Sequence, residues 1–177
     1  SQLNTDWFDS AVNPDFVSVK QLLIHTDAER FPYRGAVWGV RAARAFSTVL
    51  GAVTVALVFG IARAVSAAAP ASRRIALLSA ALVAFNPKFV HVSSIVSNDI
   101  AIICAASLAC WWLCRMLARA QPRDIDYGVL GGLIGLATLS KLGGLGLWLP
   151  ALIAIGGRAG QRQAGAVARR LGVVLAG

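Results

Sequence analysis

A thirty-one-residue stretch with a single charge constrains the fold of this chain more than any other feature. Residues 127–157 contain one charged side chain, Lys141, between uncharged segments of 14 and 16 residues. An isolated cation at membrane depth is costly, so it is usually paired, located at an interface or functional. We expect two short helices that meet at a glycine turn and present the ammonium group at one membrane face. There it can hold an anion such as a lipid phosphate.

The rest of the chain repeats this apolar pattern. Of its residues 57% are apolar and 14% are charged, whereas soluble domains have about 25% charged residues. A spanning helix needs roughly 20 mostly apolar residues. The runs predict spans at 36–63, 73–96, 98–115, 127–140 and 142–157, the last two short, with a new apolar run from 171. The fold class is therefore all-α, a polytopic membrane protein with about five transmembrane helices and the start of a sixth.

The basic residues are distributed unevenly between the two sides of this predicted bundle. Ten arginines lie at alternate junctions, and the opposite short turns contain only Lys141. The ten are Arg63, Arg73, Arg74, Arg115, Arg119, Arg123, Arg158, Arg162, Arg169 and Arg170. This is the positive-inside pattern. It predicts that residues 1–41, Asn98 and Lys141 face outside. The net charge of +9 then reflects topology, and we expect no nucleic-acid partner.

Residues 1–35 are predicted to form an extracytoplasmic loop ahead of the transmembrane domain 36–177, which we expect to be part of a longer chain. Asn13-Pro14-Asp15 is typical of a helix start, and residues 15–26 suit a short helix on the membrane surface. His25 and Glu29 could serve acid–base or metal chemistry. Solvated charge on an outer loop is the commoner fate of such residues.

Asn86-Pro87 predicts a kink in the second span, because proline removes a helical hydrogen bond. Lys88 and His91 follow it, and a regular helix would place them on the order of 10–15 Å deep. Two interpretations stay open. These side chains line a water-filled cleft that faces Lys141, or they pair locally with carbonyls that Pro87 exposes.

Asp99 is the only acid between residues 30 and 123. With Asn98 it could bind a metal ion or orient a substrate, or either residue could simply cap the helix that starts there. Lys141 could bind a phosphate or extend to the membrane interface. Gly143 and Gly144 would let a lipid head group approach the backbone. The series Gly128, Gly131, Gly132 and Gly135 predicts close helix packing.

Four segments in order resemble bacterial membrane glycosyltransferases of the GT-C superfamily, of the polyprenol-phosphate-sugar-dependent, protein-mannosyltransferase-like and ArnT-like types. The resemblance covers about residues 22–157. The segments are 25–32 (HTDAERFP), 44–52 (RAFSTVLGA), 84–89 (AFNPKF) with Ser97-Asn98-Asp99, and 132–141 (GLIGLATLSK).

The resemblance implies transfer of a sugar from a polyprenyl-phosphate carrier to an unknown acceptor, at the outer face of a bacterial plasma membrane. It assigns Lys141 to the donor phosphate, as the lysine of the family's small-residue motif, with Ser140 in place of the common Thr. Asp99 corresponds to a second outer-loop acid, for which Mg²⁺ or Mn²⁺ is a possible partner. The main catalytic Asp is expected upstream of Ser1, so residues 1–177 alone should be inactive.

Two alternatives belong to other functional classes. A polytopic transporter or lipid flippase would use Lys88, His91 and Lys141 along a pathway. A non-catalytic membrane subunit would need no polar cleft.

Overall fold

The computed structural model describes residues 31–32, 35–119, 121–157 and 160. Within these residues every regular element is a helix, which agrees with the all-α prediction. The predicted surface helix at 15–26, His25, Glu29 and the apolar run from 171 lie outside the described residues. They stay predictions.

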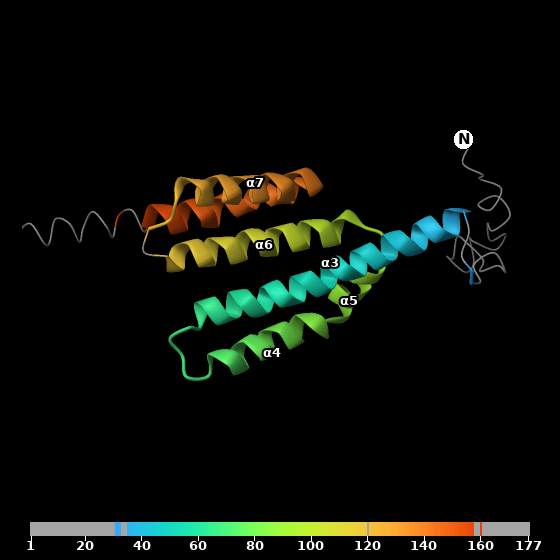
Figure 1. Cartoon of the computed structure of the whole chain (residues 1–177), viewed down its shortest axis with the longest axis horizontal. Helices are drawn as coiled ribbons and strands as arrows, with labels where there is room; N and C mark the ends of the chain where they lie inside the picture. Colours follow the sequence, from blue (N-terminus) through green and yellow to red (C-terminus); the bar gives the residue numbers. More distant parts are fainter. Residues whose placement is uncertain (1–30, 33–34, 120, 158–159, 161–177) are drawn as a thin grey trace, which may run out of the picture.

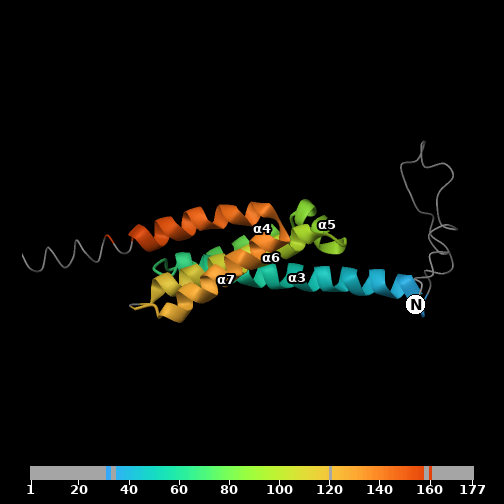
Figure 2. The same ribbon diagram turned by 90° about the horizontal axis from the view of Figure 1, so that it is seen from above.

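Helix α3 (Gly35–Val65) is the longest element of the bundle. Its segment Val37–Val65 has a mean hydropathy of 2.2 and only 22% of its most apolar window is buried. At 1.5 Å per residue α3 is about 46 Å long, well beyond the roughly 30 Å of a hydrocarbon core. Its N-terminal turns therefore extend past the other helices, as both views show (Figures 1 and 2).

The second predicted span is broken in two. Helices α4 (Ser72–Ala84) and α5 (Pro87–Ser94) meet at an angle of 61°. Phe85 and Asn86 separate them, and the Asn86 side chain accepts hydrogen bonds from the backbone N–H groups of Lys88 and Phe89. The kink at Pro87 is confirmed. The depth given for Lys88 and His91 applied to a regular helix, and the break between α4 and α5 means that this condition is not met.

The third and fourth predicted spans correspond to α6 (Asn98–Ala118) and α7 (Asp124–Ser140). Next comes an apolar helix, Leu142–Gly157, whose first six residues form the 3₁₀ helix η2 (Leu142–Leu147). By length and composition, two described helices can cross a membrane, or three if α4 and α5 form one span. The other two predicted spans are shorter helices, so a total of five stays a prediction.

Helices α3 and α6 form the middle of the bundle, with α4 and α5 packed on α3, and with α7 and η2 on the other side. A cluster of buried side chains joins α6, α7 and the helix after η2: Ala109, Met116, Leu130, Ile134 and Ala151. Much of the outer surface is apolar, for example Leu82 and Leu139, which are 76% and 87% exposed. Such a surface suits lipid better than water.

The glycine series in α7 does not pack as the sequence suggested. A Cβ added at Gly128, Gly131, Gly132 or Gly135 would meet nothing within 4 Å among the described atoms. The close approaches occur elsewhere. Gly51 lies against Ser93, Gly60 against Trp111, and Gly144 against the backbone of Thr138 and Ala137.

The connections between the helices lie at two opposite ends of the bundle (Figure 1). One end, which we call the arginine end, includes the α3–α4 and α6–α7 connections with Arg63, Arg73, Arg74, Arg115, Arg119 and Arg123. The opposite end, the lysine end, includes the start of α6 and the link between α7 and η2, with Asp99 and Lys141. This arrangement has the grouping that the charge pattern predicts.

Candidate functional site

Two residues singled out from the sequence form an ion pair at the lysine end. The Lys141 ammonium Nζ lies 2.7 Å from Oδ1 of Asp99, across 42 residues of sequence. The side chains are 57% and 45% exposed. A pair as exposed as this contributes little to stability. We therefore treat the ion pair as a feature of the surface at this end and not as a source of stability for the fold.

Lys141 is positioned by the backbone on both of its sides. It is extended, and its N–H donates to the Ala137 carbonyl at 3.1 Å, which ends α7. The Gly144 N–H then donates to the Lys141 carbonyl at 2.9 Å. Gly144 is buried, and a Cβ there would lie 2.4 Å from the Thr138 nitrogen. The expected role of Gly144 in admitting a lipid head group is thus wrong, because its open side is filled by α7.

Asp99 projects from the first turn of α6. The cap of that helix is Ser97, whose hydroxyl oxygen accepts from the Asp99 N–H at 3.0 Å. The interpretation of Asn98 or Asp99 as the cap was therefore wrong. The Asn98 amide instead donates to the Ser140 carbonyl at 3.4 Å, so both residues connect α6 to the end of α7.

A cavity of about 660 Å³ opens beside this ion pair. Lys88, Asp99 and Lys141 contribute charged groups to its wall. The rest of the lining is mainly apolar and comes from α4, α5, α6 and the α4–α5 link: Leu82, Val83, Asn86, Phe89, Val92, Ile102 and Ile103. His91 is exposed and is not among the lining residues. The structure thus brings Lys88 to the same cavity as Lys141, as the cleft interpretation expects, and leaves His91 outside it.

The described residues do not by themselves form a metal site. No three His, Cys, Asp or Glu side chains in the described ranges lie close enough together to hold an ion. Asp99 is a single carboxylate, and its Oδ1 already accepts from Lys141. The Mg²⁺ or Mn²⁺ ion expected as a possible partner of Asp99 stays a prediction.

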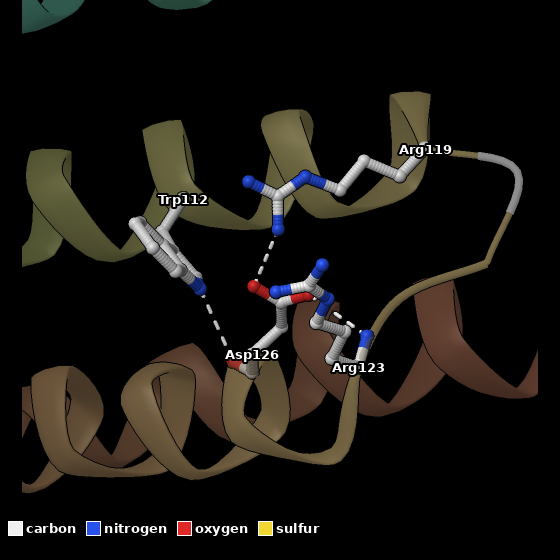
Figure 3. A network of polar contacts seen from close by, with 4 residues as sticks. All are labelled: Trp112, Arg119, Arg123 and Asp126. Atoms are coloured by element: carbon white, nitrogen blue, oxygen red, sulfur yellow. Dashed lines mark hydrogen bonds and ion pairs between the residues drawn. The ribbon is translucent and has the colours of Figure 1, made fainter.

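A second polar cluster, which the sequence did not single out, lies at the arginine end (Figure 3). The buried Asp126 accepts from the Arg119 guanidinium and, at 2.9 Å, from the Arg123 backbone N–H. The Trp112 indole donates to the Asp126 carbonyl at 3.1 Å. The Arg123 N–H and the Arg119 guanidinium hold the pKa of the Asp126 carboxyl below its ordinary value. The only sequence signal was an acid in the first turn of a helix that follows an arginine-containing loop.

Helices that are long and apolar enough to cross a membrane define the class as an integral membrane protein. A family model described as dolichyl-phosphate-mannose-protein mannosyltransferase matches residues 37–175. The chain belongs to this family, whose members are membrane glycosyltransferases. The match confirms the family suggested by the sequence resemblance. Comparisons with curated proteins and with solved structures gave no match.

Proposed function

We propose that this chain belongs to an enzyme that transfers a sugar from a polyprenyl-phosphate carrier to an acceptor on the extracytoplasmic side, with the donor bound at the lysine end. The observation that carries the proposal is the Asp99–Lys141 ion pair on the wall of a mainly apolar cavity. A donor of this class has a charged phosphate and a hydrocarbon chain. The cavity offers a surface for each part.

Lys141 supplies the contact to the phosphate. An ammonium group has three donors, and Asp99 occupies one of them. The others can reach a phosphate oxygen without breaking the ion pair. Transfer of the sugar leaves negative charge on the departing phosphate, and a fixed cation beside it stabilises that charge in the transition state. Asp99 keeps the ammonium at the cavity rather than extended into solvent.

The apolar lining would contact the hydrocarbon chain of the donor, and Lys88 would lie near its phosphate. Leu82, Phe89 and Ile103 on the wall suit the first units of a hydrocarbon chain. Lys88 is exposed and lines the same cavity, held at the start of α5 by the Asn86 cap. It adds a second positive charge near the phosphate.

The test is donor use by the native full-length protein in lipid vesicles, with Lys141→Ala. A charge-assisted contact contributes about 1.5–3 kcal/mol, so donor use should fall roughly ten- to a hundredfold. Lys141→Arg should recover only part of the lost donor use, because a planar guanidinium group replaces a compact ammonium group. Arg74→Ala removes one charge at the opposite end and serves as the matched control. Near-wild-type donor kinetics for well-folded Lys141→Ala would remove the phosphate-binding role.

The transporter or flippase alternative is not favoured, since the family consists of glycosyltransferases. The same vesicles distinguish the two. Movement of the lipid-linked sugar across the bilayer without transfer to any acceptor would favour the alternative over the enzyme.

A further inference from the structure

A second cavity, of about 580 Å³, lies at the arginine end, away from the proposed donor site. Arg119, Gln121, Arg123, Ile125 and Asp126 line it, and they come from the α6–α7 connection and the first turn of α7. Two guanidinium groups face one carboxylate here. The lining side chains therefore carry two formal positive charges and one negative charge, and Gln121 adds an amide.

The wall of this cavity is held in place by the hydrogen bonds around Asp126. Its carboxylate accepts from Arg119 and from the Arg123 backbone, and its carbonyl accepts from Trp112 (Figure 3). The described part of the connection is thus anchored to both α6 and α7. Because Arg123 contributes its backbone N–H to this network, its side chain can bind a ligand without dismantling the wall.

The surroundings indicate what kind of anion fits. Ile125 lines the cavity and is 69% exposed, so an apolar edge lies directly beside the guanidinium groups. Arg115 stacks on Trp111, with 4.8 Å from its guanidinium carbon to the ring centroid, on the same end of α6. Tryptophan and arginine at the end of a spanning helix are typical of the level of lipid head groups. Arginine binds phosphate oxygens in a bidentate manner.

We propose that this cavity binds the phosphate group of an anionic membrane phospholipid, with Arg123 and Arg119 on the phosphate and Ile125 against the glycerol and acyl part. The site is separate from the donor cavity. Its ligand is a resident lipid of the bilayer and takes no part in the reaction.

The experiment measures binding of phosphatidylglycerol to the purified native protein in neutral detergent, with phosphatidylcholine as the zwitterionic lipid and inorganic phosphate as the free anion. Tight binding of phosphatidylglycerol alone is the expected result. Arg123→Gln should weaken it about five- to tenfold, the range of one partly exposed charge-assisted contact. Arg74→Gln removes the same charge at the same end, outside the lining residues, and should change binding less than twofold.

Three results would overturn the proposal. Equal losses for Arg123→Gln and Arg74→Gln would mean that only the general charge of this end attracts the lipid. Binding of inorganic phosphate as tight as that of phosphatidylglycerol would mean that the site takes a free anion. If Arg123→Gln does not fold, Gln121→Glu places a negative charge on the wall outside the Asp126 network, and unchanged phosphatidylglycerol affinity in that variant would refute the lipid site.

Discussion

Gly144 offers a direct test of how the fold positions Lys141. In Gly144→Ala the new Cβ would lie 2.4 Å from the Thr138 nitrogen and 2.5 Å from the Ala137 carbonyl carbon. Real Cβ atoms essentially never come closer than 3.0 Å, so η2 and the last turn of α7 must separate by several tenths of an ångström. Both contacts are backbone atoms, which cannot rotate away as a side chain can.

The expected cost is that of overpacking a filled site, about 1–3 kcal/mol. For a domain of this size that corresponds to a fall in apparent Tm of roughly 3–9 °C. The separation also moves Lys141, because the Gly144 N–H donates to the Lys141 carbonyl. Donor use should therefore fall together with stability.

The assay is thermal unfolding of the purified native protein, followed by tryptophan fluorescence, with donor kinetics measured on the same samples. Gly146→Ala is the matched control. It makes the same substitution in the same 3₁₀ helix, where a Cβ would meet nothing within 4 Å of the described atoms. Equal Tm values and equal donor kinetics for the two variants would show that this contact does not hold Lys141 in place.

Two further predictions concern topology and the Asp126 network. Single cysteines at positions 98 and 119, in a background without native cysteines, should be labelled by an impermeant thiol reagent from opposite sides of the membrane; labelling of both from one side would contradict the topology. The pKa of the Asp126 carboxyl is lowered in the folded state, so the ionised carboxylate stabilises the fold above roughly pH 4. This contribution to stability is lost as the pH falls through the lower pKa of the folded state. Unfolding midpoints measured from pH 6 to pH 3 should fall further for the wild type than for Asp126→Asn, which lacks the titrating group. Asp124→Asn removes the same charge without these hydrogen bonds and should follow the wild type; identical profiles for all three proteins would refute the assignment.

Features that depend on neighbouring residues could be predicted from the sequence. The uncharged runs predicted helices because an apolar backbone in lipid must satisfy its own hydrogen bonds. Asn86-Pro87 predicted the break between α4 and α5, since a proline and a capping side chain act within one helical turn. The alternation of arginines with Lys141 predicted which helix ends lie together. Lys141 and Asp99 also stood out, because each is an isolated charge in an apolar context.

Tertiary structure alone decided the contacts between helices. The pairing of Asp99 with Lys141 across 42 residues depends on how α6 and α7 pack, and no local pattern encodes that distance. For Lys88 the sequence left a cleft and local pairing both open, and the structure places it on the wall of the cavity beside Asp99 and Lys141. Glycine spacing predicted a packing face on α7, whereas the close contact is made by Gly144 with the α7 backbone. The size and spacing of side chains along a helix indicate which faces another helix can approach. Which face is buried depends on how all the helices pack together.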